Sequence, residues 1–180
     1  LDEAATLQMP IGRRLDVALT YVCVAGVGLF GWIFYFVVNR TTVEGREHIP
    51  PRGRNILFVA VHQGMYDSFL IGVSGFFPSV LLYPARPPYN FPAEENFGRY
   101  WPLRIILHFL RTIFVKAGRR DVRLLRRLNP LLKKSNILIF YQGRRSYDVE
   151  EFRARSVPYL ISERLKANEP TFVIPVYHTG

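Results

Sequence analysis

The longest hydrophobic segment lies near the start of the chain, where Val17 to Val38 contains 22 consecutive uncharged, mostly apolar residues. As a helix it would be about 33 Å long at roughly 1.5 Å per residue, and the hydrocarbon core of a bilayer is about 30 Å thick. A secretory signal is the alternative, but the segment is long for one and no small-residue cleavage pattern follows it. We therefore expect residues 1–43 to form a membrane anchor with its flank.

Three glycines within this segment, Gly26, Gly28 and Gly31, leave the form of the anchor open. Glycine inside a helix costs about 1 kcal/mol relative to alanine, so the anchor is expected to be either one helix or a re-entrant pair of helices. Arginines flank the segment on both sides, and the positive-inside rule therefore gives no orientation.

From residue 44 onward the hydrophobic pattern changes to short apolar runs separated by stretches with helical periodicity. This alternation predicts an α/β fold with a mixed, largely parallel sheet flanked by helices. We expect it to fill a domain over 44–180 that continues beyond residue 180. The expected strands are Asn55 to Val61, Val80 to Tyr83, Thr112 to Val115, Ile137 to Tyr141 and Thr171 to Tyr177. The expected helices are Gly98 to Leu110, Asp121 to Lys134 and Val157 to Ala167.

The positive charge of the chain is concentrated in one segment. The net charge is +10, and residues 111–145 contain eleven Lys or Arg against one acid, Asp121. Such a segment is expected to meet phosphates, of lipid headgroups or of nucleic acid. Lipid is favoured, because an anchor precedes the basic run and aromatic residues are not interleaved with it. The lone Cys23 and four scattered histidines predict neither a disulfide nor a metal site.

A histidine and an aspartate with catalytic potential follow the first expected strand. His62 comes directly after an apolar run, which places it at the carboxyl end of a strand, where open α/β sheets have their sites. If a helix begins near residues 64–66, Asp67 lies in its first turn and can accept a hydrogen bond from His62 Nδ1. His62 Nε2 would then be free to act as a base. Alternatively, Asp67 only caps a helix and His62 is structural.

Two arginines follow the fourth expected strand in a similar way. Arg144 and Arg145 come after a turn at Gly143, so they are expected at the same edge of the sheet as His62. The planar guanidinium of arginine pairs well with phosphate oxygens, and glycine lets the backbone approach a ligand. A basic turn exposed to solvent is the alternative.

These residues together resemble the glycerolipid acyltransferase family, which includes the 1-acylglycerol-3-phosphate acyltransferases. The first motif of that family, His-x4-Asp, is matched by His62 and Asp67. Residues of the third motif, Phe-Pro-Glu-Gly-Thr-Arg-Ser, stand at Phe140, Gly143, Arg145 and Ser146. The second and fourth motifs are echoed by residues 112–116 and 173–176. The resemblance covers roughly Asn55 to Tyr177.

The resemblance implies that His62 takes the proton of an acceptor hydroxyl, which attacks the thioester of acyl-CoA or acyl-carrier protein without an acyl-enzyme. No cofactor is implied. The implied acceptor is a lysophospholipid such as 1-acylglycerol-3-phosphate, and the implied location is the cytoplasmic face of the bacterial inner membrane. A non-phosphate acceptor, such as a glycolipid or a lipoamino acid, remains an alternative. So does a non-catalytic membrane module that binds anionic lipid.

The departures from the family motifs affect the acceptor more than the base. Tyr141 and Gln142 replace Pro-Glu in the third motif. If the Glu of the family binds an acceptor hydroxyl, Gln142 is expected to hydrogen-bond it instead; if that Glu balances charge near the arginines, this site is more positive than in its relatives. Ala117 stands near the position of a terminal Arg in the second motif. The residues expected to contact the substrate are therefore Arg86, Lys116, Arg119, Gln142, Gly143, Arg144, Arg145 and Ser146, with the backbone of Gly64 as an oxyanion candidate.

Overall fold

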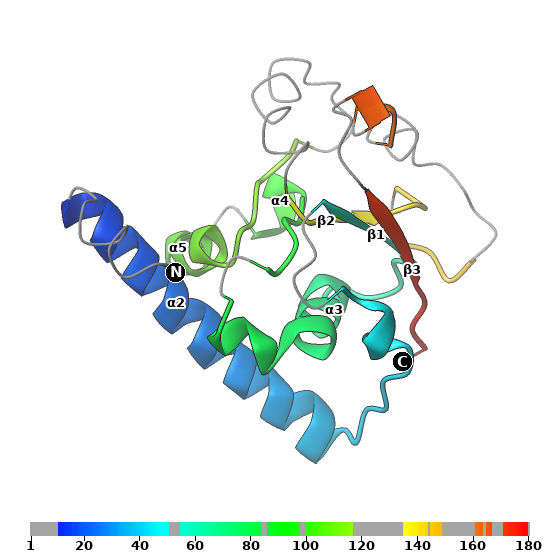
Figure 1. Cartoon of the computed structure of the whole chain (residues 1–180), viewed down its shortest axis with the longest axis horizontal. Helices are drawn as coiled ribbons and strands as arrows, with labels where there is room; N and C mark the ends of the chain where they lie inside the picture. Colours follow the sequence, from blue (N-terminus) through cyan, green and yellow to red (C-terminus); the bar gives the residue numbers. More distant parts are fainter. Residues whose placement is uncertain are drawn as a thin grey trace.

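A computed structural model describes residues 11–50, 55–83, 86–97, 100–116, 135–143, 145–148, 161–163, 165–166 and 171–179. Its elements in chain order are α2 (Ile11–Trp32), the π-helix η1 (Ile33–Val38), the 3-10 helix η2 (Arg46–His48), β1 (Ile56–Ala60), α3 (Asp67–Phe76), the 3-10 helix η3 (Ser79–Leu81), α4 (Glu94–Phe97), α5 (Trp101–Phe109), β2 (Ile137–Phe140) and β3 (Phe172–Val176) (Figure 1). The predicted α/β fold is confirmed, with a parallel sheet flanked by helices and an apolar helix at the amino-terminal end.

The three named strands form one parallel sheet in the order β2-β1-β3. They correspond to the first, fourth and fifth strands expected from the sequence. Ala60 of β1 is paired with Phe140 of β2 on one side and with Val176 of β3 on the other. The carboxyl ends of all three strands therefore lie side by side, and residues that follow these ends meet at one edge of the sheet.

The central strand is buried on both faces. Ile56, Phe58 and Ala60 join a core cluster that includes Phe76 of α3 and Val24 of α2. Leu57, between them in the sequence, packs with Ile137 and Ile139 of β2 in a second cluster. A strand covered on both faces needs a continuous apolar run rather than alternation, which explains why the sequence signal at residues 56–61 is so plain.

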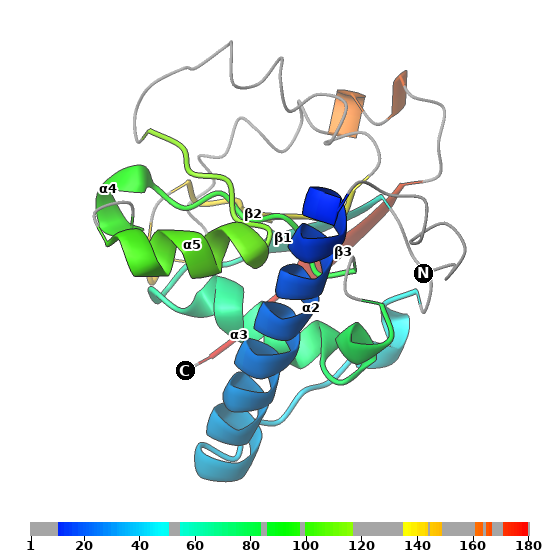
Figure 2. The same ribbon diagram turned by 90° about the vertical axis from the view of Figure 1, so that its left-hand side faces the viewer.

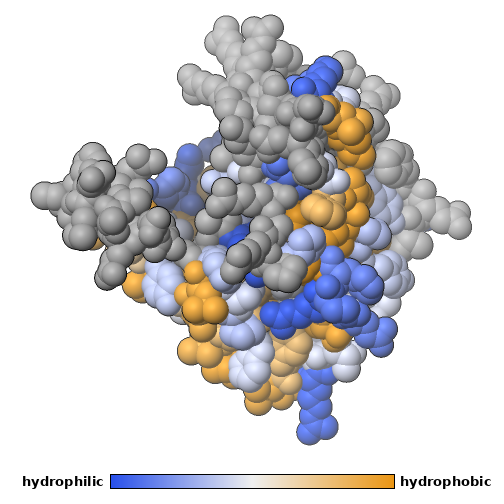
Figure 3. All heavy atoms as spheres, in the orientation of Figure 1, coloured by the Kyte–Doolittle hydropathy of each residue, from blue (hydrophilic) through white to orange (hydrophobic). Residues whose placement is uncertain are grey.

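The apolar amino-terminal segment is one helix over its described residues. It runs without reversal from Ile11 through α2 and η1 to Val38, and it passes α5, α3 and η3, which it contacts (Figures 1 and 2). Residues Leu15–Val38 are long and apolar enough to cross a membrane. Hydrophobic side chains gather along its outer side, among them Leu15, Leu19, Val22, Leu29 and Phe30 (Figure 3).

Two of the glycines in α2 serve close packing and do not fold the helix back. A Cβ atom at Gly31 would lie 2.5 Å from Phe69 Cζ and 2.7 Å from Val73 Cγ2, both on α3. At Gly28 it would lie 3.0 Å from Phe77 Cδ2. Because glycine has no Cβ, α2 can lie against α3 with its backbone close to the ring of Phe69. The apolar helix and the sheet domain are thus packed together along the helix.

Replacing Gly31 with alanine is expected to destabilise the protein by about 1–3 kcal/mol, the usual cost of overpacking a tight contact. Gly26→Ala is the matched control, because a Cβ at Gly26 meets nothing within 4 Å. That variant is expected to gain up to about 1 kcal/mol from helix propensity. Thermal unfolding of both variants in detergent measures the difference. Equal unfolding temperatures for the two variants would contradict the packing role of Gly31.

Two predicted strands are wrong or incomplete. The run Val80 to Tyr83 is not a strand, since η3 covers its start and Val80 is buried near Gly28 of α2. The run Thr112 to Val115 makes only isolated parallel bridges, from Thr112 to Asn90 and from Val115 to Ala93. Tyr89 in turn bridges to Ile137 of β2, so these segments extend the sheet in broken form beyond β2.

The expected helices have different outcomes. The helix expected over Gly98 to Leu110 is present as α5. Residues 161–163 and 165–166 are helical, as expected for part of Val157 to Ala167. The basic helix expected over Asp121 to Lys134 lies outside the described residues, and so does Arg119.

Candidate active site

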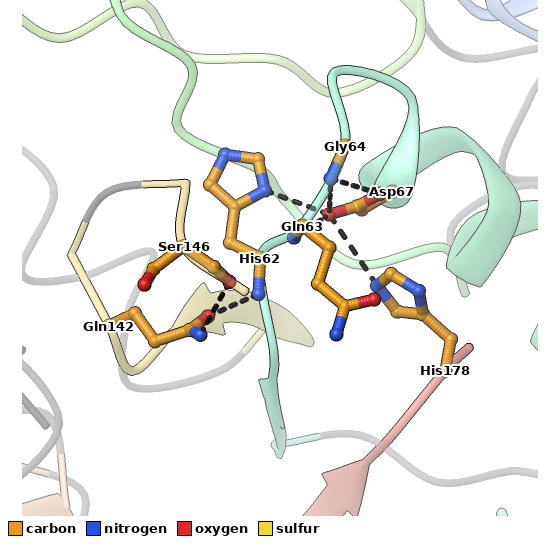
Figure 4. Close-up of polar contacts among 7 residues, drawn as sticks. All are labelled: His62, Gln63, Gly64, Asp67, Gln142, Ser146 and His178. Carbon is orange, nitrogen blue, oxygen red and sulfur yellow. Dashed lines mark hydrogen bonds and ion pairs between the residues drawn. The ribbon is translucent and has the colours of Figure 1, made fainter. Parts of the chain in front are cut away.

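His62 lies two residues beyond β1, and its backbone is held by the turn that follows β2. Its N–H donates to the Gln142 side-chain oxygen Oε1, and its carbonyl accepts from Ser146 N–H at 2.7 Å (Figure 4). The imidazole stacks on Phe140, with ring centroids 4.1 Å apart and planes 19° from parallel. Residues of the third motif therefore fix the position of the histidine of the first motif.

The Asp67 carboxylate holds the imidazole of His62. Asp67 is the first residue of α3, and its Oδ2 lies 2.9 Å from His62 Nδ1. The side chain of Asp67 is 8% exposed and that of His62 is 22% exposed. With an ionised carboxylate as partner, Nδ1 carries the proton and donates it, so Nε2 is left as the acceptor. This is the tautomer that a general base requires.

Asp67 also organises the loop between His62 and α3. Its Oδ2 accepts from the N–H groups of Gln63 and Gly64, each at 2.8 Å, and its Oδ1 accepts from Gly64 N–H at 3.0 Å. The positive end of α3 further favours a carboxylate at this position. The sequence left helix capping as the alternative to a contact with His62. Asp67 is the first residue of α3, but its carboxylate binds the loop amides ahead of the helix as well as His62.

The oxyanion role expected for Gly64 does not fit this geometry. Its N–H is engaged by both oxygens of Asp67 and is not free for a substrate. A Cβ at Gly64 would lie 2.8 Å from Asp67 Oδ1. Glycine is therefore needed here so that the loop backbone can approach the carboxylate.

The side chain of Gln142, expected to contact substrate, is instead fully buried, with 0% exposed. Besides accepting from His62 N–H, it donates through Nε2 to the carbonyls of Ser146 and Asp148, each at 2.9 Å. Gly143, next to it, has φ +70, which favours glycine. Gln142 thus joins β1 to the turn after β2, and acts as a brace for His62.

The cations expected to bind phosphate are not all in one place. Arg145 is exposed on the turn that holds His62, and Lys116 is exposed just after the bridge at Val115. Arg144 and Arg119 lie outside the described residues. Ser146 is engaged within the protein, since its backbone bonds His62 and Gln142 and its Oγ accepts from Asp148 N–H of the same turn at 3.1 Å.

The structure does not bring Arg86 to the other expected substrate contacts, because its partners lie near the start of β1. Its carbonyl accepts from Asn136, whose side-chain oxygen accepts from Ile56 N–H at the start of β1. Its guanidinium donates to Ser79 Oγ and to the carbonyl of Pro50, and burial lowers the pKa of Arg86 below its ordinary value. Ile56 and His62 are six residues apart, roughly 20 Å at about 3.3 Å per residue of strand, so Arg86 lies toward the other end of β1 from His62.

One residue at the site was not identified from the sequence. His178 lies two residues beyond β3, and its Nε2 is 3.5 Å from Asp67 Oδ2. The paired ends of the strands make His62, Gln142 and His178 equivalent positions, each two residues beyond its strand. Like His62, His178 follows an apolar strand, which is the sequence signal that could have identified it. Unlike His62, it has no acidic partner close by in the sequence.

The structure thus combines a parallel sheet flanked by helices with a His–Asp pair at its carboxyl edge, which the turn after β2 holds in place. The model of the family described as Acyltransferase matches residues 40–178. The chain therefore belongs to the acyltransferase family, which includes the glycerolipid and 1-acylglycerol-3-phosphate acyltransferases. No curated protein and no solved structure shows a significant match.

Proposed function

We propose that this acyltransferase moves a fatty acyl chain from the thioester of acyl-CoA or acyl-carrier protein to a hydroxyl of a lysophospholipid such as 1-acylglycerol-3-phosphate. The observation that carries the proposal is the 2.9 Å contact between His62 Nδ1 and Asp67 Oδ2. It leaves His62 Nε2 as a proton acceptor at the edge of the sheet, the position that a general base for a bound alcohol would occupy.

The proposed reaction is one displacement. His62 Nε2 takes the proton of the acceptor hydroxyl as its oxygen attacks the thioester carbonyl carbon. The C–O bond forms, the C–S bond breaks, and the thiolate takes the proton back from the imidazolium. Asp67 stabilises that imidazolium through its charge. Among the described residues, Asp67 is the one side chain that hydrogen-bonds the His62 ring, which supports attack without an acyl-enzyme.

The proposed location is the cytoplasmic face of the bacterial inner membrane, where both thioester donors are found. The outer side of α2 exposes large apolar residues, which suit the hydrocarbon of a bilayer. Its inner side packs on α3. The basic segment over residues 111–145 is then proposed to meet anionic headgroups or the acidic acyl-carrier protein.

The test is a screen of purified protein in anionic vesicles, with acyl-CoA and acyl-carrier protein donors and a panel of acceptors, read by lipid mass spectrometry. The panel contains 1-acylglycerol-3-phosphate, other lysophospholipids, a glycolipid and a lipoamino acid. A phosphate-bearing product supports the proposal. Acylation of the phosphate-free acceptors alone would establish the alternative acceptor class. If no donor and acceptor pair reacts, the proposal fails, and salt-sensitive binding to anionic vesicles would then favour the non-catalytic module.

The phosphate of the acceptor is proposed to bind Arg145. Arg145→Ala is expected to raise KM for the acceptor by a factor of about 10 to 100, because a charge-assisted hydrogen bond contributes about 1.5–3 kcal/mol. Arg104→Ala is the control, since Arg104 is an exposed arginine on α5 that is already paired with Glu94 at 3.2 Å. Steady-state kinetics with varied acceptor measure both. An unchanged acceptor KM in Arg145→Ala would exclude phosphate recognition by this residue.

A further inference from the structure

Two histidines, from different strand ends, face one oxygen of Asp67. Oδ2 lies 2.9 Å from His62 Nδ1 and 3.5 Å from His178 Nε2, and the two rings approach it from different sides (Figure 4). The His178 side chain is 13% exposed. Its Nε2 is buried and has no hydrogen-bond partner within the described part of the chain. A buried ring nitrogen without a partner is costly, so this placement calls for an explanation.

The separation between His178 Nε2 and Asp67 Oδ2 determines which kind of interaction the two groups can make. At 3.5 Å, Nε2 is in ion-pair range of Asp67 but beyond an ordinary hydrogen bond, which is about 2.7–3.2 Å. Catalytic hydrogen bonds are often long in an enzyme without substrate and shorten when substrate binds. A shift of a few tenths of an ångström would make His178 a direct donor to the carboxylate. The ring does not contact His62 itself, so any influence on the base passes through Asp67.

We propose that His178 is a positioning residue for the acyl transfer proposed above. Its Nε2–H fixes the Asp67 carboxylate from the side opposite the loop amides, and so holds the oxygen that orients His62 Nδ1. The Gln63 and Gly64 amides reach Asp67 from the loop, and His178 reaches it from β3. With all of these donors in place the carboxylate has one rotamer, and His62 Nε2 points in one direction.

The pairing of β3 with β1 explains how a residue that follows β3 reaches Asp67. Val61 N–H donates to the Val176 carbonyl at 3.3 Å, which continues the β1–β3 pairing beyond the named strands. The backbone on both sides of the site is therefore tied together up to the residue before His62. His178 follows Val176 by two residues, so its ring has little freedom to leave Asp67.

The test compares His178→Leu with His178→Gln, because the Gln amide nitrogen takes nearly the place of imidazole Nε2 and leucine has no donor. His178→Leu is expected to lower kcat about tenfold or more, the lower end of what residues behind metal-binding histidines contribute, with the donor KM unchanged. His178→Gln is expected to restore kcat to within about threefold of the wild type. Equal losses in both variants, or no loss in His178→Leu, would overturn the proposal.

A spectroscopic measurement separates this inference from the proposed function. In protein labelled with 15N-histidine, the downfield Nδ1–H signal of His62 reports its bond to Asp67 without any substrate. It should weaken or move in His178→Leu and stay in His178→Gln. If the wild type transfers no acyl group, this comparison still decides the role of His178. If the signal is the same in all three proteins, the inference fails even though the enzyme is active.

A third variant covers the case in which His178→Leu does not fold. His178→Asn keeps the amide but is one carbon shorter than His178→Gln, so its nitrogen does not reach Asp67 Oδ2. We expect His178→Asn to show the loss and His178→Gln to show the rescue. Identical rates and identical His62 signals in these two variants would overturn the proposal.

Discussion

Replacing His62 with alanine is expected to lower kcat by a factor of about 10² to 10⁴, the usual contribution of a positioned general base. The variant loses the nitrogen that would accept the hydroxyl proton. It keeps the backbone bonds from residue 62 to Gln142 and Ser146, which do not involve the imidazole. Folding and membrane binding should therefore be retained. Thiol release from the donor measures the rate, and thermal unfolding verifies the fold.

His48→Ala is the matched control for that variant. His48 lies on the 3-10 helix η2, with its side chain 77% exposed, and its polar contacts among the described residues are with the adjacent Glu47 and the Gly45 carbonyl. It should keep the rate of the wild type. Turnover at the wild-type rate in His62→Ala would exclude His62 as the base. A similar loss in both variants would show that the assay responds to histidine content or to handling of the protein.

Replacing Gln142 with leucine is expected to lower the free energy of unfolding by about 3 kcal/mol. The side chain satisfies three backbone groups, the N–H of His62 and the carbonyls of Ser146 and Asp148. Leucine has a similar volume but bonds none of them, and each buried group left without a partner costs about 1–3 kcal/mol. Because the turn then loses its hold on residue 62, kcat should fall as well. Chemical denaturation and thiol release measure the two effects.

Gln63→Leu is the matched control for Gln142→Leu. Gln63 adjoins the site, but its side chain makes no hydrogen bond within the described part of the chain, and only its backbone N–H bonds Asp67. Its replacement should change stability by no more than about 0.5 kcal/mol. If Gln142→Leu unfolds at the same denaturant concentration as Gln63→Leu, the brace between β1 and the turn after β2 contributes nothing.

The identity of residue 142 can be explained by what surrounds it. In the third motif of the family a Glu stands here. In this chain Gln142 must donate to two carbonyl oxygens as well as accept from one N–H. An ionised carboxylate could accept from His62 N–H, but it would face the carbonyls of Ser146 and Asp148 with a negative oxygen. The amide suits these three partners better than a carboxylate does.

The strands that the sequence predicts most plainly are those whose hydrophobic pattern fits one kind of structure only. The runs at Ile56–Ala60 and Ile137–Phe140 are apolar throughout because both faces are buried, so they were identified as strands. Val80 to Tyr83 is equally apolar, but it begins in a 3-10 helix where Val80 alone is buried, beside α2, while Leu81 to Tyr83 are exposed. A short apolar run does not distinguish these cases, since periodicity needs more residues than it has.

The site was predicted where its partners are near in sequence. His62 and Asp67 are five residues apart, so local geometry was enough to predict their contact, and the structure has it at 2.9 Å. The functions of Gln142 and Arg86 depend on burial against distant segments, which their residue types do not reveal. His178 is 111 residues beyond Asp67 (178 − 67). Only the order and register of the parallel strands bring it to the carboxylate.

The contact of Gly31 with Phe69 and Val73 has a consequence for the choice of acceptor. At Gly31 the backbone of the apolar helix packs directly against side chains of α3. The helix is therefore fixed to the domain and does not move independently of it. In the membrane orientation proposed above, the depth of His62 relative to the bilayer plane is then set by the fold. The enzyme would then select acceptors by how far their hydroxyl projects from the membrane interface while their own acyl chain stays in the lipid.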